Sequence, residues 1–179
     1  MSDHSMLTSE DIGRFWTHVE KTDTCWNWIG SITRGYGQIC LRKNKVQTKY
    51  RAHRVSYWIS NGDIPEGLFI DHICLNRACV RPDHLRLVTA RQNNENLSGA
   101  QKRNASGFRG VTWHSETRRW RARVVHGGTE YFLGEFNDPE EAGLAARAKR
   151  LELQTHNELD RNGSWKPTMR VSLRPDGHR

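Results

Sequence analysis

The sequence predicts an α+β protein made of two small modules, and three observations support this fold class. Apolar residues recur at helical spacing in some segments and alternate with polar residues in others, so both helices and half-buried strands are expected. Residues 98–107, "SGAQKRNASG", contain no apolar residue except alanine, which predicts a linker. Hydrophobic residues make up only 35% of the 179-residue chain, so a small module would need a further source of stability, such as a bound metal. We therefore divide the chain into a first domain, the linker, a second domain and a basic tail, at residues 1–97, 98–107, 108–160 and 161–179.

Charge and cysteine content restrict the partner and the compartment. Lys and Arg outnumber Asp and Glu by 28 to 20, and the sequence pI is about 9.7, which favours nucleic acid as a partner, with an acidic membrane second. No apolar run approaches the ~18 residues that span a bilayer, and the start "MSDHSMLTSEDIGRF" lacks the layout of a secretion signal. We expect a cytoplasmic protein with reduced thiols, so its four cysteines favour metal ligation over disulfide bonds.

The first half of the first domain should contain a helix, a hairpin and a second helix. Residues 7–21 have apolar side chains at helical spacing after a Thr–Ser cap, which predicts an amphipathic helix. Residues 25–44 alternate and contain the glycines of "GYG", which predicts a hairpin. Residues 50–62 follow a helical pattern that ends at a glycine.

The second half of this domain carries every side chain that suits a metal site. Cys74, Cys79 and His84 lie close together in sequence, and two thiolates with an imidazole on a tight loop suit tetrahedral zinc. A structural zinc takes a fourth protein ligand, for which Cys25 and Cys40 are the remaining thiols. The alternative is buried cysteines that bind no metal. The predicted order is strand, loop, strand and helix, over residues 67–74, 77–85, 85–89 and 90–97.

The run "DHICLNRACVRPDHLRLVTARQN", with upstream "CWNWIG", "GYG" and "RAHR", resembles the HNH or ββα-metal endonucleases over roughly residues 12–97. It is similar in particular to the zinc-bearing branch, which includes the His-Cys box homing endonucleases and phage HNH proteins. The resemblance implies that His72 is the general base for a water that attacks the scissile phosphate, and that Asn93 holds a divalent cation such as Mg²⁺. It also implies a structural zinc that leaves Cys40 as a free core thiol, with the ligands Cys25, Cys74, Cys79 and His84.

Three further residues match positions of this family. Asp71 precedes the base, and in many HNH relatives that acid is a second ligand of the catalytic cation, whereas the His-Cys box branch lacks it. A surface or helix-capping carboxylate is therefore the alternative for Asp71. At the start of the second predicted helix, we expect Arg54 to bind phosphate and His53 to serve packing.

The second domain has a different pattern. The runs "GFRGVTWH", "RRWRARVVHG" and "TEYFLGEF" alternate and are joined by turns, and a helix over residues 138–157 should follow, with Asp138 as its cap. These elements predict a three-stranded antiparallel sheet packed on one helix. The period of two places three arginines of the second run on one sheet face, where either water or phosphates would meet them.

Residues 106–155 are similar to the AP2 domain, in the "FRGV" start, the "LGEF" strand and the "EEAGLAA" helix. AP2 domains lay their sheet in the major groove, and arginine reads guanine in two-point contacts. Glu116 and Thr117 stand where an arginine- or tryptophan-bearing turn is usual, and Phe132 where tryptophan is usual, so the target base sequence cannot be read from these residues. The linker would contribute Lys102 and Arg103 to DNA binding, and the domain Arg109, Thr112, His114, Arg119, Arg121, Arg123 and Phe132.

Together the two resemblances predict a sequence-directed, divalent-metal-dependent endonuclease of the homing type. It would be encoded by a phage or an intron and would act on double-stranded DNA in the host cell, with no membrane partner. A zinc-stabilised DNA-binding protein without catalysis is the alternative, against which the intact His72 and Asn93 argue. RNA binding or cleavage draws on the same charge. A monomer would nick DNA and a homodimer could cut both strands, and both remain open.

Overall fold

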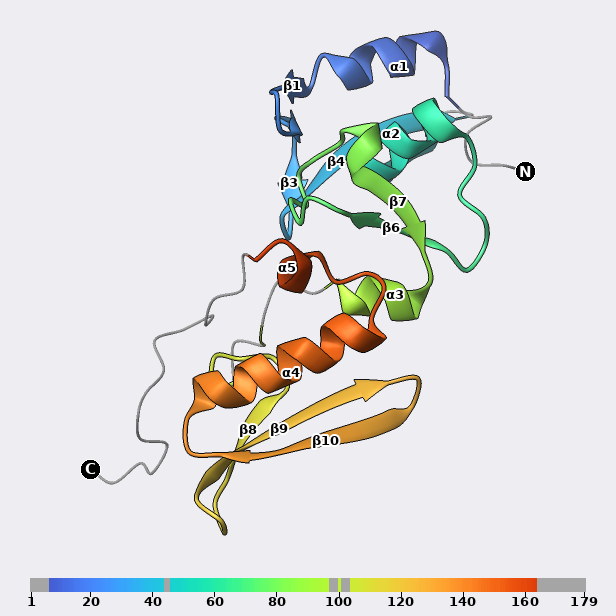
Figure 1. Cartoon of the computed structure of the whole chain (residues 1–179). Helices are drawn as coiled ribbons and strands as arrows, with labels where there is room; N and C mark the ends of the chain where they lie inside the picture. The colour runs from blue at the N-terminus through green and yellow to red at the C-terminus, as the bar shows by residue number, and fades with distance from the viewer. Residues whose placement is uncertain (1–6, 44–45, 97–99, 101–103, 164–179) are drawn as a thin grey trace. The chain divides into compact units, whose positions relative to one another are not determined.

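A computed structural model describes residues 7–43, 46–96, 100 and 104–163 (Figure 1). Its contacts divide the chain into two compact units, residues 1–93 and 94–179, each of which is described by itself. Half of the predicted linker, including Lys102 and Arg103, and most of the predicted basic tail lie outside the described residues. No helix among the described residues is long and apolar enough to cross a membrane.

Unit 1 begins with helix α1 (Ser9–Trp16), which a capping box starts. The Thr8 hydroxyl accepts the N–H of Asp11 at 3.1 Å, and the Asp11 carboxylate accepts the N–H of Thr8 at 3.3 Å. The helix is shorter than the predicted 7–21, because the Thr17 hydroxyl donates to the Arg14 carbonyl at 2.8 Å and takes the acceptor that the next turn would use. Val19, predicted to be helical, instead opens strand β1 (Val19–Lys21), which pairs with β2 (Trp26–Trp28).

The next strands form an antiparallel sheet in the order β3-β4-β5. The predicted hairpin is β3 (Ile32–Thr33) with β4 (Tyr36–Lys43), and its two turn residues both have positive φ, 52° at Arg34 and 83° at Gly35, as a type I′ hairpin turn requires. Strand β5 (Val46–Arg51) was not predicted, because its side chains are largely polar and exposed and only its pairing with β4 defines it.

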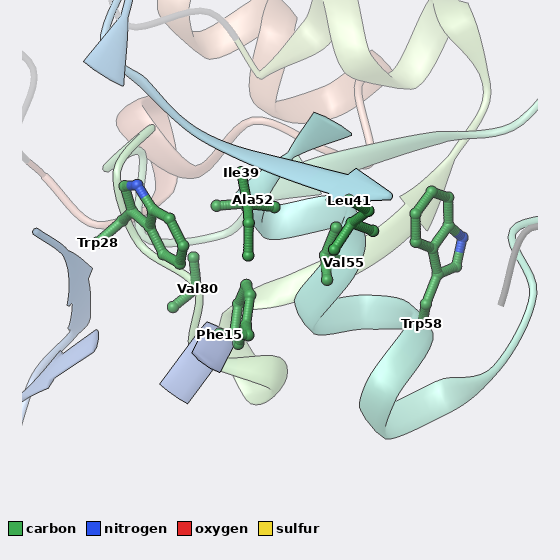
Figure 2. Close-up of a cluster of buried hydrophobic side chains, with 8 residues drawn as sticks. All are labelled: Phe15, Trp28, Ile39, Leu41, Ala52, Val55, Trp58 and Val80. Carbon is green, nitrogen blue, oxygen red and sulfur yellow. The ribbon is translucent and has the colours of Figure 1, made fainter. Parts of the chain in front are cut away.

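Helix α2 (Ala52–Asn61) ends at Gly62, close to the predicted range, and supplies one wall of the unit 1 core. Figure 2 shows side chains from α1, β2, β4 and α2 converging on that core. Trp28 closes one end of it, and a Cβ atom at Gly37 would lie 2.6 Å from the Trp28 ring, so only glycine fits there. The buried members are Phe15, Trp28, Ile39, Leu41, Ala52, Val55, Trp58 and Val80.

The predicted strand, loop, strand and helix follow. Strand β6 (Phe69–His72) pairs antiparallel with β7 (Leu85–Val88), and the short 3₁₀ helix η2 (Pro82–His84) precedes β7. Helix α3 (Ala90–Glu95) starts directly after Thr89, whose hydroxyl and N–H both bond to Gln92. The last strand and the helix are therefore joined by a single capping residue.

Unit 2 contains the predicted three-stranded antiparallel sheet and helix. The strands β8 (Val111–His114), β9 (Arg119–His126) and β10 (Thr129–Phe136) lie in the order β10-β9-β8, and helix α4 (Pro139–Leu153) packs on all three. The Asp138 carboxylate caps α4, as expected, by accepting the N–H of Glu140. The core between sheet and helix consists of Phe108, Val111, Trp120, Ala122, Val124, Ala142 and Ala146.

A buried polar network closes unit 2 behind the end of α4. The chain leaves the helix at Leu153 rather than at residue 157 and forms a short helix that was not predicted, α5 (Glu158–Arg161). Arg150 and Asp160, both 2% exposed, form two hydrogen bonds of 2.6 and 3.1 Å. Asn104, assigned to the linker from the sequence, donates to the Phe108 carbonyl at 3.0 Å and is thus tied into this unit.

Candidate active site, metal centre and sheet surface

Four side chains in unit 1 form a cluster with the chemistry of a zinc site. Their ligand atoms all lie within 4.8 Å of one another, and His84 Nδ1 is 3.8 Å from the sulfur of Cys25 and 3.6 Å from that of Cys79. Three thiols and one imidazole are a donor set that fits tetrahedral zinc. Cys40 lies on β4 outside the cluster, so the structure brings together the predicted ligands Cys25, Cys74, Cys79 and His84.

The local backbone explains how Cys25, far away in sequence, reaches the others. The N–H of Val80 donates to the Trp26 carbonyl at 2.7 Å, which joins the start of β2 to the loop after β6. The Arg81 guanidinium donates to the Asp23 carbonyl at 2.9 Å and fastens the turn that precedes Cys25. These two bonds hold the segment around Cys25 against the loop that carries Cys74 and Cys79.

Hydrogen bonds prepare one thiol for ionisation. The pKa of Cys79 is lowered because the Cys74 thiol donates to its sulfur and because backbone N–H groups, including that of Arg81 at 3.4 Å, do the same, although burial opposes the shift. The same contact raises the pKa of Cys74, whose proton the Cys79 thiolate holds. Cys79 is therefore the first of the two to reach the thiolate form that metals bind.

His72, the predicted general base, is the last residue of β6 and is 5% exposed. Its Nε2 lies 3.1 Å from the carbonyl oxygen of Cys79. A carbonyl only accepts, so Nε2 must carry the hydrogen, and in the neutral ring the lone pair is on Nδ1. Burial lowers the pKa of His72, against the raising effect of the Cys79 carbonyl, so the neutral, proton-accepting form is favoured.

The two residues predicted to hold the catalytic cation have different surroundings. Asn93 is half-buried on α3, and its N–H donates to the Thr89 carbonyl at 2.9 Å in the first turn. Asp71 is buried and lies opposite Arg86 in the β6–β7 register, with Arg86 Nε at 3.0 Å from its carboxylate. Arg86 thus already neutralises this carboxylate, an ion pair that sequence spacing did not reveal.

Aromatic rings surround His72. The His53 ring packs edge-on against it at 4.8 Å, and the Tyr36 ring lies 6.0 Å away. His53, expected to serve packing, is buried, and its pKa is lowered to about 2 by burial first and then by the charges of His72, Arg54 and Arg51. Tyr36 belongs to the "GYG" hairpin, and its closeness to His72 follows from the fold, not from sequence spacing.

Residues 50–95 match the model of the HNH endonuclease family. The chain is also 32% identical over 124 residues to protein 3.8 of Escherichia phage T7, a match that covers 68% of this chain and 98% of that protein. The chain belongs to the family of phage T7 protein 3.8. Its HNH domain contains His72, Asn93 and three of the four cluster residues, whereas Cys25 precedes it.

Other phage proteins match shorter stretches. Protein 2.8 of phage T7 is 36% identical over 75 residues, covering 41% of this chain and 48% of that protein. An uncharacterised gene 5.3 protein of Enterobacteria phage T3 is 44% identical over 61 residues, covering 33% of this chain and 60% of its own length. No solved structure matches the chain. The match to the HNH endonuclease family supports the interpretation of this protein as a nuclease, which would act on nucleic acid with the help of a divalent metal.

The open face of the unit 2 sheet gathers most of the residues predicted to contact DNA. Along β9, Trp120, Ala122 and Val124 are buried, so the intervening arginines lie on the other face, as the alternation predicted. Phe132 on β10 is 60% exposed and lies opposite Arg123 in the β9–β10 register. The members of this face that were predicted are Thr112, His114, Arg119, Arg121, Arg123 and Phe132.

Two carboxylates on the same face were not anticipated. Glu135 Oε1 accepts from Arg121 at 2.8 Å and lies 3.7 Å from His114 Nδ1, and Glu130 accepts from Arg123 at 3.3 Å. The pKa of Glu135 is lowered, chiefly by its hydrogen bond from Arg121, so it is ionised at neutral pH. Two of the three arginines therefore already have anionic partners in the free protein.

The remaining predicted phosphate ligands are engaged to different degrees. Arg109 is half-buried and donates to the carbonyls of Glu95 at 2.8 Å and Asn94 at 3.3 Å, so these donors serve the fold. Arg54 is half-buried, and its guanidinium carbon lies over the Trp58 ring at 5.8 Å from the ring centre.

Proposed function

We propose that this protein is a DNA endonuclease that hydrolyses phosphodiester bonds, with His72 as its general base. The observation that carries the proposal is the hydrogen bond between His72 Nε2 and the Cys79 carbonyl inside an HNH domain. It fixes the proton-accepting nitrogen as Nδ1. An imidazole held in one tautomer and kept neutral is suited to remove a proton from an attacking water.

The Cys79 carbonyl then has a second role. As Nδ1 takes the proton, the ring becomes cationic, and the carbonyl that accepts from Nε2–H stabilises this charge. Because Cys79 also supplies a thiol to the cluster, a structural zinc there would hold the loop that orients His72. The proposed zinc ligands are Cys25, Cys74, Cys79 and His84.

We propose Asn93 as a ligand of the divalent cation, because a neutral amide oxygen suits Mg²⁺. Such a cation, when bound, would stabilise the charge that develops on the phosphate and the leaving oxygen. Asp71 is the second candidate ligand. The ion pair between Asp71 and Arg86 instead favours a structural role, in joining β6 to β7. The variant Asp71→Asn distinguishes the two roles. If Asp71 is a metal ligand, its replacement should shift the Mg²⁺ dependence of cleavage.

For unit 2 we propose an AP2-like domain that lays its sheet in the major groove of double-stranded DNA, which would make cleavage sequence-directed and of the homing type. The support is the strand order, the single packed helix and the arginine-bearing open face. Arg109 would support the sheet, and base contact would fall to Thr112, His114, Arg119, Arg121, Arg123 and Phe132. The reduced thiols of the cluster and the phage relatives suit action in the cytoplasm of a host cell.

The test is relaxation of supercoiled plasmids that carry candidate target sites, by zinc-loaded wild-type protein, His72→Ala and Asn93→Ala, with and without Mg²⁺. His156→Ala is the matched control, since its Nδ1 bonds locally to Thr155 in unit 2. We expect cutting by wild type and control only, and only with Mg²⁺, and the ratio of nicked to linear product reports whether one strand or both are cut. If wild type binds these sites but cuts none, the protein is a zinc-stabilised DNA-binding protein instead.

A further inference from the structure

Two arginines from separate elements meet on one aromatic ring beside His72. Arg51 ends β5 and Arg77 lies in the loop between Cys74 and Cys79. Their guanidinium carbons lie 4.6 Å and 5.3 Å from the centre of the Tyr36 ring, and that ring is 6.0 Å from the ring of His72. Neither arginine belongs to the zinc cluster, the hydrophobic core or the predicted DNA-binding set.

The fold holds both side chains at this place. Arg51 donates to the Thr33 carbonyl at 3.3 Å, which ties its guanidinium to the β3–β4 hairpin. At the tip of the same hairpin, a Cβ atom on Gly35 would lie 3.6 Å from Cδ of Arg77, so the arginine stem runs against the glycine backbone. The two cations are therefore positioned by the hairpin that also carries Tyr36.

Stacking on a ring leaves a guanidinium able to bind an anion. The π-face of tyrosine attracts the face of the cation, while all five N–H groups lie in the guanidinium plane and point away from the ring. Arg77 is exposed, and Arg51 uses one donor on Thr33. The remaining donors form forks that match the two oxygens of a phosphate.

Electrostatics also favours an anionic ligand here. Two like charges gathered on one ring repel each other, and this repulsion is relieved when a phosphate lies between or beside them. Arg54, the next cation along the chain, adds to the positive field around His53. A nuclease substrate supplies such charges at every nucleotide.

We propose that Arg51 and Arg77, held on Tyr36, bind the backbone phosphates at the cleavage position and set the scissile bond against His72. The proposal rests on the nuclease function and adds to it a phosphate clamp, defined as Tyr36, Arg51 and Arg77. The arginines touch the substrate, and Tyr36 acts through them as a positioning residue. Because the charge on the phosphate group increases in the transition state, the clamp should raise the rate of the chemical step and not only the affinity.

Single-turnover cleavage at saturating protein tests the clamp. Arg77→Gln should lower the rate roughly 10- to 100-fold, the loss of one or two charge-assisted hydrogen bonds. Tyr36→Leu should lower it as well, whereas Tyr36→Phe keeps the ring and should stay within about twofold of wild type. Arg42→Gln is the control for charge alone, because Arg42 is an exposed arginine on β4 that is not part of the clamp.

A second readout separates phosphate binding from a structural role. In the His72→Ala background, which prevents cutting, Arg77→Gln should reduce the slope of log affinity against log salt for duplex DNA by about 1. Melting temperature and zinc content should match those of Arg42→Gln, since Arg77 is exposed. Arg51→Gln repeats the test on the second arginine of the clamp, and its bond to Thr33 makes a folding check by circular dichroism necessary.

The outcomes are distinct. If wild type cuts and Arg77→Gln cuts as fast as Arg42→Gln with an unchanged salt slope, the clamp is wrong and the nuclease stands. A lower melting temperature with an unchanged slope would reassign Arg77 to the fold and overturn the clamp. Wild-type protein that cuts no DNA overturns both proposals.

Discussion

At the scale of single residues, burial decides the state of the two histidines that touch each other. His53 and His72 pack edge-on at 4.8 Å, and burial is the main reason that the pKa of each is lowered. Two adjacent cations at this depth would repel each other as well as lose hydration. His53 is thus uncharged at neutral pH and packs against the ring of His72, which agrees with the packing role expected from the sequence.

The depressed pKa of His53 makes a pH prediction for stability. Its pKa is about 2 in the folded state and 6.5 when unfolded, so between these values only the unfolded chain takes up the proton. The free energy of unfolding should fall as pH drops below about 6.5, by at most ~1.4 kcal/mol per pH unit from this residue. Urea unfolding at pH 7.5 to 5 should therefore show a flatter dependence for His53→Gln than for wild type. Equal slopes for the two proteins would contradict the assignment.

The buried ion pair between Arg150 and Asp160 in unit 2 makes a prediction about removing one of its two charges. Asp160→Ala leaves Arg150 buried without its carboxylate and should cost ~3–5 kcal/mol, seen as faster hydrogen exchange in β9. Glu152→Ala removes a carboxylate that is 62% exposed and pairs with Lys149, and should cost no more than ~1 kcal/mol. Similar costs for the two variants would mean that the pair contributes little.

At the scale of elements, the irregular pairing of β10 with β9 determines the charge of the sheet face. Uninterrupted alternation from Glu130 and Phe132 would place Glu135 on the inner face. The register shifts between Phe132 and Gly134, so Glu135 lies opposite Arg121 on the open face. The sequence therefore predicted the row of arginines and could not predict that two of them are paired.

These pairs should limit non-specific binding. Glu135→Gln releases Arg121, so binding to unrelated duplex DNA should tighten and the log–log salt slope should steepen by about 1, measured by fluorescence anisotropy. The control is Glu152→Gln, the same change of charge on α4. If both variants bind alike, the carboxylate does not restrain Arg121.

Sequence patterns predicted the cysteine–histidine cluster but not the phosphate clamp. Cys74, Cys79 and His84 were recognisable because ligand types and spacing on one loop define zinc chemistry without reference to the rest of the fold, whereas Cys25 was assigned by the family resemblance. Tyr36, Arg51 and Arg77 were not recognised, because they come from three elements and only the hairpin and the loop after β6 bring them together. Strand β5 and helix α5 were missed for a related reason, since both have polar sequences defined by their partners.

At the scale of the whole molecule, each unit has its own core, and only unit 1 has a metal cluster among the described residues. Cys25→Ser should therefore lose zinc, destabilise unit 1 and abolish cleavage while leaving the hydrogen exchange of β8 to β10 unchanged. Cys40→Ser, outside the cluster, should keep zinc and activity. Metal analysis with hydrogen exchange checks this, and zinc loss from Cys40→Ser instead would overturn the ligand set.

One residue, Cys79, offers its sulfur to the cluster and its carbonyl to His72. Oxidation or loss of metal at this sulfur would therefore also disturb the carbonyl that holds His72, the proposed base. On the proposed function, a preparation exposed to air or purified on a chelating resin would no longer cut DNA, while the sheet of unit 2 would still bind it. Such a sample would behave as a DNA-binding protein without nuclease activity. Its free thiols should therefore be titrated before its DNA products are examined.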